Sequence, residues 1–222
     1  IGFDPVQLSR GRVVTMATKG TKKKSTVSPE KRILQAAMSL AAVQGWRDTT
    51  MADIADQTEM SLAELWKHFA SKNSILVGIV QVADDAVLRG SDASIEEEPV
   101  HDRLFDVIMR RLHEHSPYKK GIAAVVNDFR HDPSSLACLA VGPMQQSLRW
   151  MLEAARIQPW GIAAPLQQKG LGLVYLAVFR VWLNDDDKDQ AKTMAALDKA
   201  LNRVESILSA LHKDPLKSHH TK

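Results

Sequence analysis

Apolar residues recur at helical spacing along the chain from residue 28 onward. The first run consists of Ile33, Ala36, Ala37, Leu40 and Ala41, which lie on one face of an α-helix. Comparable runs span residues 72–89, 101–115, 118–130, 134–157, 165–184 and 188–212. No segment alternates between apolar and polar residues in the way that indicates a half-buried strand. The pattern therefore predicts an all-α protein.

Three short helices are predicted before residue 70. Their starts are marked by the N-cap candidates Ser28, Thr50 and Ser61, each followed within three positions by an acidic residue. Gly45 is expected to end the first helix as a left-handed C-cap, and a break near Glu59 separates the second helix from the third. Two short helices joined by a tight break are typical of a helix-turn-helix.

Changes in composition divide the chain into four predicted segments. These are a disordered basic arm (1–27), a helix-turn-helix head (28–90), a helical body (100–212) and a disordered polar tail (213–222). The lysine-rich arm either contacts phosphates or only solubilises the protein. Gly142–Pro143 is expected to kink the helix over 134–157, and the acids at 185–187 indicate a solvated turn.

Composition limits the functions that the chain can have. The formal net charge is only +3 over 222 residues, so any affinity for nucleic acid must come from local clusters of cations. The one cysteine, Cys138, fits a small buried hydrophobe in a cytoplasmic protein. No transmembrane segment is predicted, because the most apolar stretch (171–183) is too short and contains Arg180. No catalytic or metal-binding motif is visible, so neither an enzyme nor a cofactor is predicted.

The segment from Ile33 to Leu76 resembles the DNA-binding head of the tetracycline-repressor (TetR) family. The matching elements are Gly45–Trp46, Thr49–Thr50, Asp53–Ile54–Ala55, Met60–Ser61, Leu65–Trp66, His68–Phe69 and Ser71–Lys72. The resemblance implies a TetR-like fold, with a three-helix head and a ligand-binding and dimerisation body of about six helices.

The same resemblance implies which residues meet DNA. Thr50 and Lys72 would bind phosphates at the starts of the second and fourth helices, where unpaired N–H groups favour anions. The other implied DNA contacts are Ser61, Leu62, Ala63 and Lys67 in the major groove, together with Trp66 and His68. Trp66 stands where the family often has a tyrosine that contacts a phosphate.

Two departures from the family pattern concern charge and backbone. Glu59 occupies a turn position that is commonly glycine. Residues 51–66 contain four carboxylates, of Asp53, Asp56, Glu59 and Glu64, and no lysine or arginine, so this surface repels phosphates. Cations would have to compensate, namely Lys31, Arg32, Lys67, Lys72 and those of the arm. The alternative is a head that keeps its fold and has lost DNA binding.

The body carries an apolar stripe on two adjacent predicted helices. Residues 148–208 are similar to the C-terminal region of the coenzyme-Q biosynthesis accessory family, which implies a cavity for an apolar small molecule or lipid. The candidate ligand-binding residues are Gln146, Trp150, Met151, Ala155, Leu171, Tyr175, Phe179 and Trp182. The alternative is that the stripe is ordinary core.

The last predicted helix has a heptad-like apolar seam formed by Met194, Leu197, Leu201, Val204, Leu208 and Leu211. This seam packs either on the body itself or on a second copy, and a homodimer is expected. The leading hypothesis is a ligand-responsive transcriptional repressor that binds a palindromic operator in double-stranded DNA. The alternative is a lipid- or isoprenoid-binding accessory protein of quinone biosynthesis without DNA binding.

Overall fold

The computed structural model describes residues 28–91, 96–129, 131, 137, 139, 141–158 and 164–213. The helices are α1 (Pro29–Gln44), α2 (Met51–Thr58), α3 (Leu62–His68), α4 (Lys72–Arg89), α5 (Val100–His115), the 3-10 turn η2 (Ser116–Tyr118), α6 (Lys119–Asp128), α8 (Pro143–Ala154), α9 (Ala164–Leu183) and α10 (Ala191–Lys213). No strand occurs in the described part of the chain, and the predicted all-α class is confirmed. The predictions for the basic arm, for Cys138 and for the tail after Lys213 lie outside the described residues.

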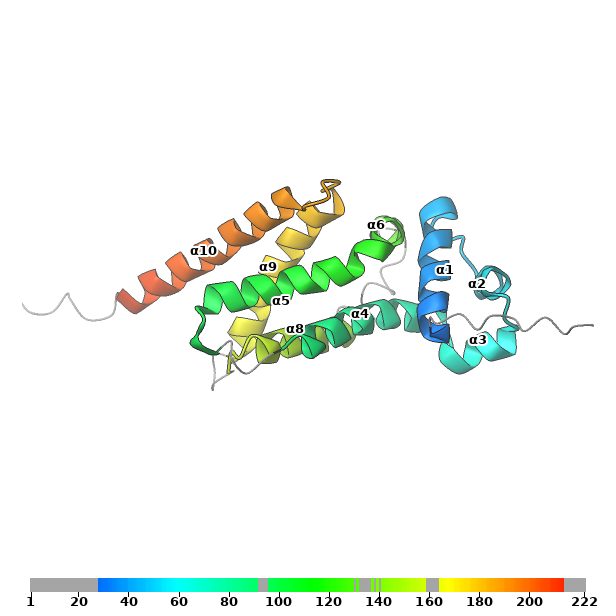
Figure 1. Ribbon diagram of the computed structural model, residues 1–222, viewed down its shortest axis with the longest axis horizontal. Helices are drawn as coiled ribbons and strands as arrows, with labels where there is room; N and C mark the ends of the chain where they lie inside the picture. Colours follow the sequence, from blue (N-terminus) through cyan, green and yellow to red (C-terminus); the bar gives the residue numbers. More distant parts are fainter. Residues whose placement is uncertain are drawn as a thin grey trace, which may run out of the picture.

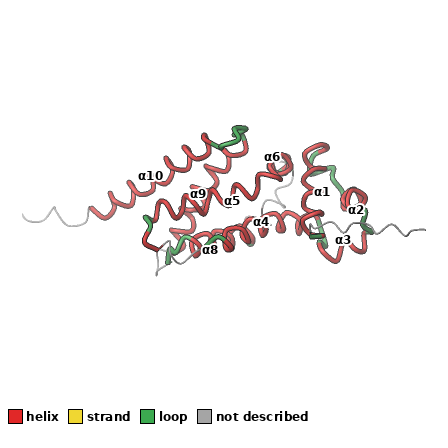
Figure 2. Tube along the Cα trace, in the orientation of Figure 1, coloured by secondary structure: helices red, strands yellow, loops and turns green. Residues whose placement is uncertain are grey.

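The helices form an elongated molecule with a small three-helix unit at one end (Figure 1). We call α1–α3 the head and α5–α10 the body. Helix α4 runs from the head into the body, where it packs on α5 and α8. Helices α9 and α10 pack side by side, away from the head. Figure 2 shows that short loops join the helices of the head, including the tight link between α2 and α3.

The head helices begin where the sequence places its caps. The Thr50 hydroxyl accepts a hydrogen bond from the Asp53 backbone N–H (3.1 Å), and the Asp53 carboxylate accepts one from the Thr50 N–H (2.8 Å). Ser61 and Glu64 form the same reciprocal pair at the start of α3. Both capping boxes are therefore confirmed, and each satisfies N–H groups that the helix itself leaves unpaired.

Two residues end helices with positive φ angles. Glu59 has a left-handed conformation (φ 55°, ψ 39°), which provides the tight turn between α2 and α3 without glycine. A side chain in this region costs about 1–2 kcal/mol relative to glycine. Gly45 has φ 88° and ψ 154°, so its φ is positive as predicted, but its ψ lies outside the left-handed helical region.

The head has its own apolar core beneath α2 and α3. Ile33 on α1, Ile54 on α2 and Leu65 on α3 are fully buried. Trp46 and Phe69 close this core from the loops that follow α1 and α3. Burial of these side chains fixes the crossing of α2 and α3, so the outer surface of the pair has a defined shape.

The head is joined to the body at a close approach between α1 and α6. A Cβ atom added to Gly121 on α6 would lie 2.3 Å from the carbonyl oxygen of Met38 on α1. The Asp128 carboxylate, at the end of α6, also accepts a hydrogen bond from the backbone N–H of Arg47 (2.8 Å). Helix α6 thus holds both α1 and the loop that leads to α2.

A buried polar network ties α4 to three helices of the body. Arg111 on α5 is fully buried and forms an ion pair with Asp84 on α4. The Ser147 hydroxyl, on α8, donates to the Asp84 carboxylate (2.5 Å), and the Arg111 Nε donates to the Tyr175 hydroxyl on α9 (3.2 Å). A buried charge is tolerated because it is paired and hydrogen-bonded in this way.

Helix α10 begins at a buried carboxylate. The Asp185 carboxylate accepts hydrogen bonds from the backbone N–H (2.8 Å) and the hydroxyl (2.6 Å) of Thr193. The prediction of a solvated turn over residues 185–187 is therefore wrong for Asp185, because these bonds compensate its burial. Leu197 and Leu201 of the predicted seam are buried against the protein's own body, while the side chains of Leu208 and Leu211 lie outside the described residues.

Candidate nucleic-acid interface

The outer face of α3 is exposed to solvent. Ser61, Ala63 and Lys67 are exposed, and the large apolar side chains of Leu62 and Trp66 are 56% and 66% exposed. Helices α2 and α3 lie on the side of α1 that faces away from the body (Figure 1). Five of the predicted DNA-contacting residues therefore share an accessible surface at the end of the molecule.

Two of the four carboxylates near this surface are engaged in the capping boxes. The backbone N–H of Thr50 lowers the pKa of Asp53, and the backbone N–H of Ser61 lowers the pKa of Glu64. Their negative charges therefore lie next to the positive N-terminal ends of α2 and α3. The Thr50 N–H already donates to the Asp53 carboxylate, so it is occupied at the position where a phosphate is predicted to bind. Asp56 and Glu59 remain exposed.

Three of the residues predicted to contact or attract phosphates bind within the head. The Lys72 ammonium donates to the carbonyl oxygens of Trp46 (2.5 Å) and Arg47 (3.2 Å) and lies over the Trp46 ring. Arg32 donates to the Thr58 carbonyl oxygen (2.7 Å). The His68 Nδ1 lies 2.7 Å from the Glu30 carboxylate, which links the end of α3 to the start of α1. These contacts brace the head.

The cations that remain on the surface of the head are Lys31, Arg47 and Lys67, all of which are exposed. Arg47 is the residue that sequence reasoning missed. It lies in the loop between α1 and α2, three residues before Thr50, and its side chain is exposed. The sequence signal is an arginine two residues before Thr49, which the pattern of apolar residues does not show.

One known protein family matches this part of the chain in sequence. Residues 33–79 fit the family model described as bacterial regulatory proteins, tetR family. The head is therefore similar in sequence to the N-terminal domains of that family. The match covers α2, α3 and most of α1, together with the first turns of α4.

Solved structures share the TetR-like fold beyond the head. A TetR transcriptional regulator from Nitrosomonas europaea matches with a TM-score of 0.67 and 22% identity, over 81% of this chain and 99% of its own. A TetR-family regulator from Shewanella sp. PV-4 matches with a TM-score of 0.55 and 19% identity, over 80% and 98%. GusR of Salmonella enterica matches with a TM-score of 0.54 and 17% identity, over 83% of this chain and 98% of its own. No curated protein sequence matches the chain.

These findings confirm the predicted TetR-like fold. At 17–22% identity, the similarity is one of fold. The family model matches residues 33–79 and does not reach residues 148–208, so their resemblance to the coenzyme-Q accessory family stays a prediction.

The predicted ligand-binding residues fall into two groups in the structure. Gln146 and Trp150 lie on the exposed side of α8. The other six pack in or against the core, namely Met151, Ala155, Leu171, Tyr175, Phe179 and Trp182. The rings of Tyr175, Phe179 and Trp182 are stacked in sequence along α9, with centroids 5.7 Å and 5.4 Å apart.

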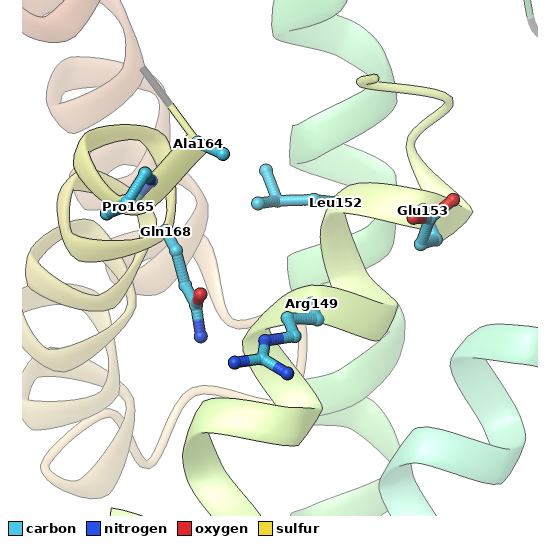
Figure 3. A pocket seen from close by; sticks show the side chains of 6 residues that line it. All are labelled: Arg149, Leu152, Glu153, Ala164, Pro165 and Gln168. Atoms are coloured by element: carbon cyan, nitrogen blue, oxygen red, sulfur yellow. The ribbon is translucent and has the colours of Figure 1, made fainter. Parts of the chain in front are cut away.

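A partly open cavity of about 410 Å³ lies instead between α8 and the start of α9. It is lined by Arg149, Leu152, Glu153, Ala164, Pro165 and Gln168 (Figure 3). The Gln168 amide nitrogen donates to the backbone oxygen (2.8 Å) and the side-chain oxygen (2.9 Å) of Gln145 on α8, so it bridges the two helices at this cavity. The volume is in the range of small-molecule sites.

Buried polar atoms without a partner gather beside the aromatic row. They include Nη2 of Arg111, Nδ1 of His115 and Nε1 of Trp182. Burial, followed by the nearby Arg111 charge, lowers the pKa of His115 to about 3. His115 is therefore neutral at physiological pH.

Two further properties of the described residues concern metal binding and membrane insertion. No three His, Cys, Asp or Glu side chains gather there in a way that could hold a metal ion. None of the described helices is both long and apolar enough to cross a bilayer.

Proposed function

We propose that the chain is a transcriptional regulator that binds double-stranded DNA with α3 and responds to a ligand in the body. The observation that carries this proposal is the exposed outer face of α3 on a TetR-type head. The second helix of a helix-turn-helix enters the major groove, and this face is accessible. The accessory role without DNA binding is not favoured, because nothing in the described body covers this face.

The charge distribution supports a DNA complex of modest electrostatic strength. The exposed cations Lys31, Arg47 and Lys67 supply phosphate contacts, while the capping boxes hold Asp53 and Glu64 against helix N-termini. Each phosphate contact releases counterions and steepens the salt dependence of binding. With few contacts, the affinity should fall less steeply with salt than it does for strongly basic DNA-binding heads.

Selection from a random double-stranded DNA library tests the DNA-binding part of the proposal. The full chain is expected to enrich one motif, and Arg47→Ala and Lys67→Ala should each lower the slope of log K against log salt by about 1. Lys199→Ala, which removes an exposed charge from α10, is the matched control and should leave the slope unchanged. Failure to enrich any motif would refute DNA binding.

We further propose that the regulator is a homodimer built on α9 and α10. Leu166, Leu173 and Leu176 are exposed on α9, and Ile207 is exposed on α10. A group of exposed apolar side chains of this kind is typical of an interaction surface. Since Leu197 and Leu201 of the predicted seam face the protein's own body, the outer face of α9 is the better candidate for the contact.

Sedimentation across a range of concentrations tests the dimer. Leu173→Glu places a charge on the α9 face, where the leucine is 71% exposed, and should give a monomer. Val43→Glu makes the same kind of change on α1, where the valine is 88% exposed, and should leave the dimer intact. A dimeric Leu173→Glu variant would place the interface elsewhere. A two-fold dimer would also give the selected motif two-fold symmetry.

For the ligand we propose the α8–α9 cavity, with an apolar molecule against Leu152 and Pro165 and a polar end near Arg149. Binding there would shift the packing of α8 on α4, and α4 carries the head. A ligand that favours a different α4 position lowers DNA affinity, which is the behaviour of a repressor that is released by its ligand.

Native mass spectrometry of the purified chain tests this assignment, with a bound apolar small molecule or lipid as the expected result. Gln168→Trp fills the cavity and should abolish the bound mass, whereas Lys169→Trp adds the same ring to the exposed side of α9. Retention of the molecule by Gln168→Trp would exclude this cavity as the site.

A further inference from the structure

The first turn of α3 offers methyl groups rather than polar atoms to a partner. The Ser61 hydroxyl donates to the Glu64 carboxylate (2.8 Å) and accepts from the Glu64 backbone N–H (3.2 Å). The Glu64 carboxylate also accepts from the Ser61 N–H (2.9 Å). The side chains of residues 61–64 are all exposed, but those of Ser61 and Glu64 are hydrogen-bonded to each other, so the apolar groups that this turn presents are Leu62 and Ala63.

No guanidinium is available on this face either. Residues 51–68 contain no arginine, and Lys67 is their one lysine, in the last turn of α3. Guanine is most often read in the major groove by arginine or lysine at its O6 and N7 atoms, whereas apolar side chains contact the C5-methyl group of thymine. The N-terminal residues of a recognition helix are those that meet base edges.

We infer that α3 recognises thymine methyl groups through Leu62 and Ala63, so that its target half-sites are rich in A·T pairs. This inference rests on the proposed DNA binding and names the base chemistry that the same surface reads. An exposed leucine gains free energy when a methyl group covers it, whereas the tied polar atoms of Ser61 and Glu64 would first have to break their own hydrogen bonds.

The experiment uses the motif that the full chain selects from a random duplex library. Two probes are compared, one with thymine and one with deoxyuridine at the same positions, so that they differ only in the C5-methyl groups. Dissociation constants are measured for the wild type, Leu62→Ala and the matched control Val43→Ala, which shortens an exposed aliphatic side chain elsewhere in the head. Circular dichroism checks that both variants fold.

The wild type is expected to bind the uracil probe about fourfold more weakly for each methyl group that is contacted. Leu62→Ala should lose much of this preference, and Val43→Ala should keep it. Equal binding of both probes by the wild type would overturn the inference while leaving DNA binding intact, and so would an undiminished preference in Leu62→Ala. If no motif is selected, the proposed function fails, and the inference fails with it.

Discussion

Replacing Gly121 by alanine should loosen the packing of α1 on α6 and lower the stability of the protein. The added Cβ would lie 2.3 Å from the Met38 carbonyl oxygen and 2.7 Å from the Met38 Cα. Carbon atoms prefer contacts of about 3.5–4.0 Å, so α1 and α6 must move apart by roughly 1 Å. Overpacking of this kind costs about 1–3 kcal/mol, against which alanine gains about 1 kcal/mol in helix propensity. Because the atoms that clash with the new Cβ include the backbone oxygen and Cα of Met38, rotation of a side chain cannot relieve the clash.

Urea unfolding followed by far-UV circular dichroism measures this effect. With a slope of about 2 kcal/mol per molar urea, a net loss of up to about 2 kcal/mol lowers the midpoint by up to about 1 M. Gly170→Ala is the matched control, since a Cβ at Gly170 on α9 meets nothing within 4 Å. It should raise the stability by about 0.5–1 kcal/mol. If Gly121→Ala stabilises the protein as Gly170→Ala does, the close approach of α1 and α6 is not as described.

Three other predictions follow from buried or strained groups. Arg111→Met should lower the free energy of unfolding by about 3–5 kcal/mol, because it leaves Asp84 with an uncompensated charge. Adding Asp84→Leu to this variant should recover most of the loss in the same urea assay. No recovery in the double variant would argue against the ion pair. Since burial lowers the pKa of His115 from 6.5 to about 3, only the unfolded chain takes up this proton as the pH falls below 6.5. Stability should therefore decrease by up to about 1.4 kcal/mol per pH unit as the pH falls from about 6.5 toward about 3. His115→Gln should show a shallower decrease, and identical slopes would refute the assignment. Glu59→Gly should raise the free energy of unfolding by about 1 kcal/mol, and with it the urea midpoint, because glycine adopts the left-handed turn without strain. It should also strengthen DNA binding by removing a carboxylate. A lower urea midpoint would show that the left-handed turn carries no strain.

The local architecture of the head could be predicted from the sequence because its signals are local. A threonine or serine followed three residues later by an acid determines a capping box, and Asp53 and Glu64 both form one. Helix α4 has the bounds that its apolar stripe indicates, from Lys72 to Arg89. These features depend on neighbours within one turn of helix, so periodicity and cap residues suffice.

The partners of charged side chains could not be predicted, because they come from distant segments. Lys72 looked like a phosphate ligand from its place at a helix start, yet its ammonium binds carbonyl oxygens 25 and 26 residues earlier. Asp185 is predicted to be solvated because it belongs to an acidic run. Its partner Thr193 lies on α10, and the two residues meet only because α10 folds back on the turn that precedes it. The aromatic residues of α9 were recognised as buried, but a stripe cannot reveal whether it lines a cavity.

The ion pair between Arg111 and Asp84 limits how α4 can move. Helix α4 is the lever between head and body, and a small slide along its axis would pull the Asp84 carboxylate from both Arg111 and the Ser147 hydroxyl. If α4 stopped partway along such a slide, the buried Arg111 would lose its partner, and an unpaired buried charge costs several kcal/mol. Helix α4 should therefore occupy discrete positions and switch between them, so that a gradual change in the body reaches the head as an all-or-none step.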